Sequence, residues 1–180
     1  MRRLARARRT AQGVLKEHAL VSAPVRVDEI AKQHAHLLYE EMDADISGML
    51  IPLPEPDRGK RWAIVVNKKH PKVRQRFTIA HELGHLLMHA FTTAHADRGY
   101  KLRFRDSRSS EGNVFEEIEA NQFAAELLMP DDLVADAAAE MQIEYAPTND
   151  RASEQALTRM ASKFHVSTQA LAVRLSNLLE

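Results

Sequence analysis

The stretch "FTIAHELGHLLMH", residues Phe77 to His89, places three histidines at four-residue intervals, with a glutamate directly after the first. In a helix, residues four apart lie about 40° apart around the axis and one turn along it. His81 and His85 can therefore direct ring nitrogens at one metal ion. Glu82 flanks the same face, close enough to take a proton from a metal-activated water without being a ligand. The opposite face is apolar and predicts packing: Ile79, Leu83, Leu86 and Leu87.

His89 continues the same row and is the first candidate for a third ligand. On an unbroken helix it lies about 12 Å along the axis from His81. Each ligand atom of a zinc ion lies within about 2.1 Å of it. We therefore expect His89 beside the metal site and not in it.

The segment "NVFEEIEANQFAAELLMP", ending at Pro130, offers a better third ligand. A helical projection places Glu117 in the middle of the apolar face, where an ionised carboxylate needs a partner. Zinc held by two neutral histidines is such a partner. Glu119 falls on the polar face with Gln122 and Glu126, which predicts a solvated side chain.

Asn121 lies one turn after Glu117 on the same predicted face. From there its amide can hydrogen-bond a ligand histidine or the ligand carboxylate. The alternative is an amide whose hydrogen bonds are satisfied inside the core. Either position predicts a side chain that is not solvated.

The composition limits the other chemistries. The chain of 180 residues has no cysteine, so disulfides, thiolate nucleophiles and cysteine-based zinc sites are excluded, and a reducing cytoplasm fits. Lys+Arg and Asp+Glu are 25 each, so no overall field favours nucleic acid or membrane. No apolar run has the length of a membrane span, and the start "MRRLARARRT" lacks the apolar segment of a secretory signal. We expect a cytoplasmic protein.

The patterns predict an α+β fold: a small antiparallel sheet packed on helices that carry the H-E-x-x-H site, with a helical C-terminal tail. Three short apolar runs predict the strands: His36 to Glu41, Ser47 to Ile51 and Arg61 to Asn67. The last run could expose an edge to a peptide backbone. We expect a metallopeptidase domain over 1–135, with a basic helix within 1–23, and a helix-turn-helix-like subdomain over 136–180.

The segments "RQRFTIAHELGHLLMH" and "EEIEANQFAAELLMP", in this order, resemble the ImmA/IrrE family of zinc metallo-endopeptidases, and the likeness spans about residues 24–135. The resemblance implies Zn²⁺ held by His81, His85 and Glu117, with Glu82 as catalytic base. It also implies a bacterial or phage protein that cleaves a helix-turn-helix repressor of the XRE type under stress.

The alternative is a non-enzymatic DNA-binding or regulatory module in which a metal only stabilises the fold. Its feature is "LTRMASKFHVSTQALAVRLSNLL", which resembles a helix-turn-helix pair. Its basic residues Arg159, Lys163 and Arg174 are few for a surface that contacts phosphates. Its apolar residues favour packing on the peptidase core instead: Leu157, Met160, Phe164, Leu171 and Leu175.

Overall fold

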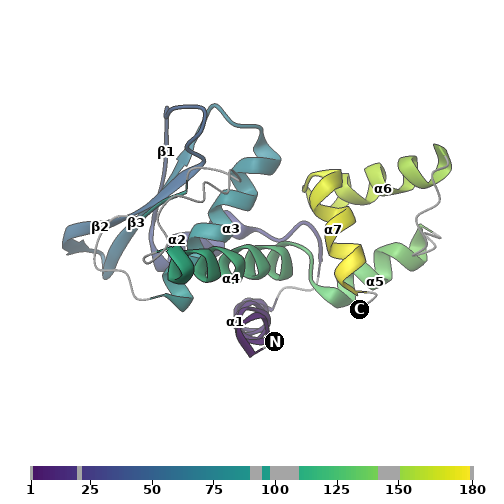
Figure 1. The fold of residues 1–180 in the computed structure, drawn as a ribbon, viewed down its shortest axis with the longest axis horizontal. Helices are drawn as coiled ribbons and strands as arrows, with labels where there is room; N and C mark the ends of the chain where they lie inside the picture. Colours follow the sequence, from purple (N-terminus) through teal and green to yellow (C-terminus); the bar gives the residue numbers. More distant parts are fainter. Residues whose placement is uncertain (1, 20–21, 90–94, 98–109, 142–150, 179–180) are drawn as a thin grey trace.

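The computed structural model describes residues 2–19, 22–89, 95–97, 110–141 and 151–178, and the fold is α+β as predicted (Figure 1). The helices are α1 (Arg2–Glu17), α2 (Val27–His34), α3 (Lys72–Met88), α4 (Ser110–Leu128), α5 (Asp131–Glu140), α6 (Arg151–Phe164) and α7 (Thr168–Leu178). The strands are β1 (His36–Glu40), β2 (Gly48–Asp57), β3 (Lys60–Asn67) and β4 (His95–Asp97). Within these ranges, no helix is both long and apolar enough to cross a membrane.

The sheet has the strand order β1-β3-β2-β4 and is mixed, so the prediction of a purely antiparallel sheet was wrong. Strands β1, β3 and β4 run in one direction and β2 runs in the opposite one, so that β2 and β3 form an antiparallel hairpin. Because β1 joins the far side of β3 and not β2, it runs parallel to β3. The fourth strand, β4, lies antiparallel to β2 and was not predicted.

The central position of β3 contradicts the expectation that this strand exposes an edge. Its residues pair with β1 on one side and with β2 on the other. The second strand also continues past its predicted end at Ile51, through Pro52 and Pro54. Beyond Leu50, β2 has a paired neighbour on one side only among the described residues. Prolines are tolerated in such an edge segment because no ladder hydrogen bond is lost there.

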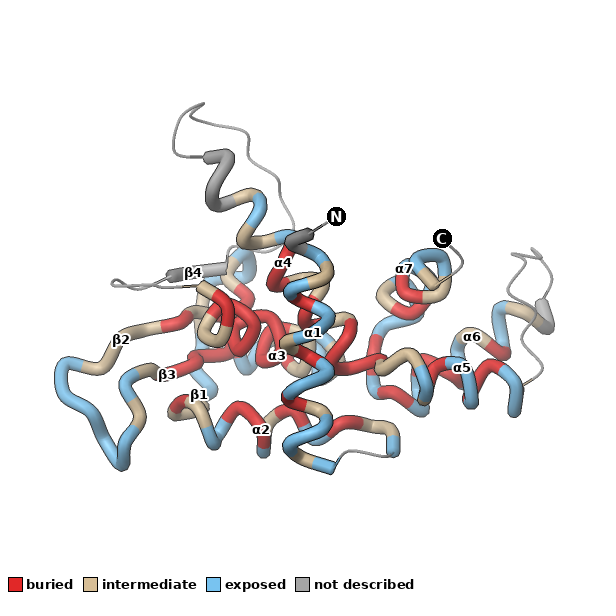
Figure 2. Tube along the Cα trace, turned by 90° about the horizontal axis from the view of Figure 1, so that it is seen from below, coloured by how far each residue is buried: buried red, intermediate tan, exposed pale blue. Residues whose placement is uncertain are grey.

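Helix α3 lies between the sheet and α4 and forms the middle of the core (Figures 1 and 2). A proline is tolerated at the start of a helix, and Pro71 directly precedes α3, which ends at Met88. A Cβ atom added at Gly84 would lie 2.8 Å from a ring carbon of Phe123 on α4. The glycine between the two histidines of the motif therefore allows α4 to approach α3 closely.

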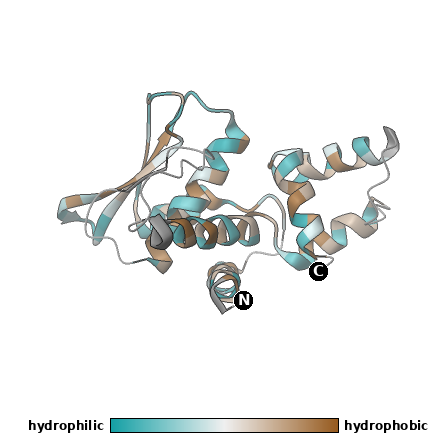
Figure 3. Ribbon diagram, viewed as in Figure 1, coloured by the Kyte–Doolittle hydropathy of each residue, from teal (hydrophilic) through white to brown (hydrophobic). Residues whose placement is uncertain are grey.

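Helix α4 is covered on two sides, by α3 and by α1. The helical spacing of Leu4, Ala7, Ala11 and Val14 predicts one core stripe on α1. The last three are buried, whereas Leu4 is 42% exposed. In Figure 3 hydrophobic and hydrophilic residues alternate along α4, without one continuous apolar stripe. A projection that assumes a single buried face was therefore wrong for Glu119 and Glu126, which are only 4% and 2% exposed.

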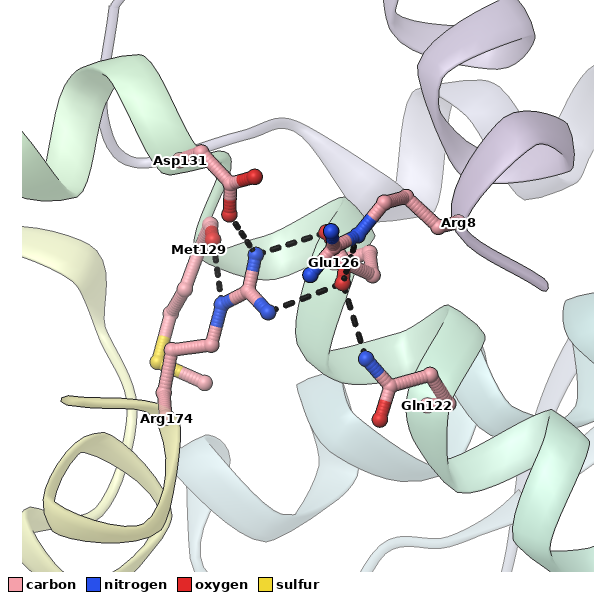
Figure 4. A network of polar contacts seen from close by, with 6 residues as sticks. All are labelled: Arg8, Gln122, Glu126, Met129, Asp131 and Arg174. Atoms are coloured by element: carbon pink, nitrogen blue, oxygen red, sulfur yellow. Dashed lines mark hydrogen bonds and ion pairs between the residues drawn. The ribbon is translucent and has the colours of Figure 1, made fainter. Parts of the chain in front are cut away.

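The C-terminal helices are fixed to α4 by a buried ion pair (Figure 4). Arg174 on α7 is 1% exposed and donates two hydrogen bonds to the Glu126 carboxylate, at 2.9 and 2.6 Å. It also donates to the carbonyl of Met129 and to Asp131, and Arg8 of α1 donates to Glu126 at 3.0 Å. Arg174, one of the three basic residues of the DNA-binding alternative, therefore does not lie at the surface.

The predicted packing of the C-terminal apolar residues is confirmed. Met160, Phe164 and Leu171 are fully buried in the main hydrophobic cluster, and Leu157 and Leu175 pack against it. Ser167 caps the start of α7, because its hydroxyl accepts a hydrogen bond from the Ala170 amide at 3.1 Å.

Candidate metal centre

Three side chains from two helices converge on one point. His81 and His85 lie one turn apart on α3, and their Nε2 atoms are 3.0 Å apart. Glu117 reaches them from α4: its carboxylate oxygens lie 3.2 Å from Nε2 of His81 and 3.2 Å from Nε2 of His85. One ligand atom from each residue falls within 4.8 Å of the others. The close approach of α3 and α4 at Gly84 brings this group together.

The donor set and its spacing fit a zinc ion. Four tetrahedral ligands at about 2.0–2.1 Å from zinc lie about 3.3 Å from one another. The Nε2–Nε2 separation of 3.0 Å and the two nitrogen–oxygen separations of 3.2 Å are close to this value. Two imidazoles and one carboxylate are also ligand types that zinc binds in proteins.

The Asn121 amide hydrogen-bonds the first ligand histidine. Its Oδ1 lies 2.9 Å from Nδ1 of His81. An amide oxygen only accepts, so Nδ1 of a neutral His81 ring carries the proton and Nε2 keeps its lone pair. That lone pair belongs to the nitrogen that points at His85 and Glu117. Asn121, one turn after Glu117, thus hydrogen-bonds a candidate ligand histidine, which is one of the two roles considered for it.

Glu117 is the most open member of the group. Its side chain is 34% exposed, whereas those of His81 and His85 are 3% and 0% exposed. It is therefore less buried than the helical projection predicted. Burial raises the pKa of its carboxyl, but without a metal the hydrogen bonds and charge of protonated His81 and His85 rings outweigh burial and hold this pKa well below its ordinary value. The carboxylate stays ionised, as a ligand to a cation must.

Glu82, the candidate base, is fully buried on α3, next to the sheet. Gly48, the first residue of β2, lies against this part of α3. A Cβ atom at this position would lie 2.4 Å from Cγ2 of Thr78 and 3.4 Å from Oε1 of Glu82. Gly48 was not predicted as a site residue, although a glycine within a strand often marks a close backbone approach. It lets the sheet approach the Glu82 carboxylate.

His89 lies beside the metal centre, as predicted, and outside the group of three ligand atoms. It is the C-terminal cap of α3, with an extended backbone. Its Nδ1 lies 3.1 Å from Nδ1 of His85, and its Nε2 lies 3.2 Å from Oε2 of Glu119. Glu119 is therefore a buried neighbour of the site. No signal in the sequence separated it from the solvated glutamates around it.

The fold and the site define a class of protein: an α+β metallopeptidase domain with an H-E-x-x-H helix and a glutamate from the following helix. The chain belongs to the family described as IrrE N-terminal-like domain, Peptidase M78, whose model matches residues 34–176. The match includes all three candidate ligands and extends into the C-terminal helices. A search among curated proteins finds no match to the chain.

Proposed function

We propose that this metallopeptidase binds zinc through His81, His85 and Glu117 and hydrolyses a peptide bond in a helix-turn-helix repressor of the XRE type. The observation that carries the proposal is the convergence of these three ligand atoms within 4.8 Å of one another, next to a second buried carboxylate on α3. The composition and the expected repressor substrate favour a cytoplasmic location, which belongs to the same proposal.

Each residue has a distinct task in the proposed hydrolysis. His81 and His85 present Nε2 lone pairs, and Glu117 supplies the negative charge that balances a divalent cation. When bound, zinc lowers the pKa of a water molecule and polarises the scissile carbonyl. Glu82 takes the proton from the attacking water and passes it to the leaving amine. The buried position of Glu82 keeps this proton transfer away from bulk solvent.

On the side of the sheet next to Gly48, the edge strand among the described residues is β4. Gly48 pairs with Asp97 of β4 and at the same time packs against α3 at Thr78 and Glu82. A substrate segment that pairs with the outer side of β4 would extend the sheet on the side of Gly48 and Glu82. Its main-chain hydrogen bonds would supply affinity, whatever its side chains. In this proposal β4 takes the role that we first expected of β3.

The DNA-binding alternative has less support. A surface that binds DNA needs several Lys or Arg side chains directed at phosphates. Arg174 is buried against Glu126, and Lys163 pairs with Glu140. The exposed residues of α7 are all uncharged: Thr168, Gln169, Ala172, Val173, Ser176 and Asn177. A salt-dependent DNA titration that shows tight binding would restore this alternative.

The proposal is tested by incubating zinc-loaded protein with the regulator encoded beside it and identifying the products by mass spectrometry. We expect one defined cut that a chelator abolishes. Casein should be cleaved slowly or not at all, because an undocked chain must be ordered at an entropic cost that a docked partner has already met. Equal chelator-sensitive rates on casein and on the regulator would indicate a general protease.

A further inference from the structure

Two buried titratable side chains beside the metal centre have no part in the proposed hydrolysis. His89 and Glu119 are only 4% and 5% exposed at their side chains. His89 lies between the ligand His85 and Glu119, with hydrogen-bond distances of 3.1 and 3.2 Å to the two. The three side chains form one row, which begins at the carboxylate of Glu119 and ends at the ligand nitrogen of His85.

The chemistry of the row fixes where its protons lie. An ionised carboxylate only accepts hydrogen bonds, so Nε2–H of His89 donates to Glu119. In a neutral His89 ring, Nδ1 is then the acceptor, and Nδ1–H of His85 donates to it. His85 consequently keeps its lone pair on Nε2. This is the atom that lies 3.2 Å from Glu117 and 3.0 Å from Nε2 of His81.

We infer that Glu119, acting through His89, is a positioning residue that holds His85 in its Nδ1–H tautomer and orients its Nε2 toward the metal. The inference rests on the zinc site of the proposed function. The two ligand histidines are then held by different partners: His81 by the neutral amide of Asn121, and His85 by a carboxylate through a second imidazole. Such partners of ligand histidines fix the ring orientation and raise ligand basicity.

The burial of Glu119 supports a specific hydrogen-bonding role over simple packing. A buried carboxylate is costly unless it is hydrogen-bonded. Its Oε2 meets His89, while its Oε1 has no hydrogen-bond partner among the described residues. The hydrogen bond from His89 is therefore the contact that compensates this burial. An apolar residue would fill the same space without that cost.

A competitive zinc titration of the full chain tests the inference. Replacing Glu119 with Leu removes the acceptor, and we expect zinc affinity to fall about ten- to hundredfold. Glu119→Gln retains an acceptor oxygen and should bind with an affinity between those of Glu119→Leu and wild type. The matched control is Glu116→Leu, because Glu116 is half-buried on the same helix and lies outside the row. Its zinc affinity should equal that of wild type.

Histidine ¹H–¹⁵N NMR spectra of the zinc-loaded protein report the tautomers directly. Wild type should carry protons on Nδ1 of His85 and Nε2 of His89, and Glu119→Leu should lose the single tautomer at His89. If Glu119→Leu does not fold, His89→Leu, which removes the middle side chain of the row, provides the affinity test. Equal zinc affinity in wild type and in the row variants, or a proton on Nδ1 of His89, would overturn the inference. If the wild-type protein itself did not bind zinc, both the proposed metal site and this inference would be refuted.

Discussion

At the scale of single residues, the proposed site assigns different tasks to three glutamates that lie on α3 and α4 near the candidate ligand histidines. Glu117 faces the two ring nitrogens, Glu119 faces His89, and Glu82 lies buried against the sheet. Because all three carry the same functional group, only their direction separates ligand, positioning residue and base. Substitutions at these positions should therefore give three different phenotypes.

Glu117→Gln should weaken zinc binding strongly, because the amide is a poorer ligand and removes the charge that balances the cation. Glu116→Gln, on the same turn of α4, should leave zinc affinity unchanged. Competitive titration of both variants measures the difference. If Glu119 were solvated, as the sequence predicted, Glu119→Gln would be the natural control. It is unsuitable because Glu119 contacts His89. Equal affinities for Glu117→Gln and wild type would remove Glu117 from the ligand set.

Glu82→Gln should abolish turnover while zinc content and thermal stability stay near those of wild type, because a base is not a ligand. Single-turnover cleavage of the repressor and metal analysis of the same sample test both halves of the prediction. Loss of zinc from this variant would assign Glu82 a structural role instead.

At the scale of elements, the metal centre depends on how closely α3 and α4 approach each other. Two of its ligands come from α3 and the third from α4, so the distance between the helices sets the separation of the ligand atoms. Gly84 on α3 faces Phe123 on α4, and a Cβ atom added there would lie 2.8 Å from a carbon of its ring. A side chain there would change the spacing of the ligands as well as the packing.

We therefore expect Gly84→Ala to lower the free energy of unfolding by about 1–3 kcal/mol through overpacking, and to weaken zinc binding. Gly13→Ala is the matched control, since Gly13 lies inside α1 with no atom within 4 Å of its added Cβ. That change should stabilise the protein by about 0.5–1 kcal/mol, because alanine is the better helix former. Chemical denaturation and zinc titration of both variants give the comparison. An equal gain in stability from both would show that α3 and α4 have room for the methyl group.

At the scale of the whole molecule, the ion pair between Arg174 and Glu126 joins the C-terminal helices to the helix that supplies Glu117. Arg8 of the N-terminal helix α1 also pairs with the Glu126 carboxylate. Three distant parts of the sequence therefore meet at one buried charge (Figure 4). The separate C-terminal subdomain expected over 136–180 stays a prediction, although α7 is firmly attached to α4 through this charge.

Arg174→Met should destabilise the protein by about 3 kcal/mol, because it leaves the buried Glu126 carboxylate without its main partner. Lys163→Met, which breaks an exposed pair with Glu140, should cost less than about 1 kcal/mol. Urea denaturation of the two variants measures both values. Similar costs would mean that the buried pair contributes no more than an exposed one.

The same pair predicts part of the acid sensitivity. Burial raises the pKa of Glu126, but hydrogen bonds and charge from Arg174 and Arg8 outweigh it, so the pKa lies below the ordinary value of 4.5. A lowered pKa in the folded state stabilises the protein fully above that ordinary value, and the contribution is lost as the pH falls through the folded pKa. The stability difference between wild type and Glu126→Gln should therefore shrink below about pH 4.5. A difference that is constant down to acid unfolding would contradict this.

The sequence by itself determined the local features. Helical spacing placed His81, Glu82 and His85 on one turn, and Pro71 marked the start of α3. The helical projection also favoured Glu117, but it placed this side chain deeper than the structure does. These features follow from backbone geometry within one element, which a periodic pattern records. The tertiary structure alone decided the parallel pairing of β1, the central place of β3, and the burial of Glu119 and Arg174. A side chain's environment depends on every element that covers it, and α4 is covered by both α3 and α1, so one helical period could not assign its glutamates.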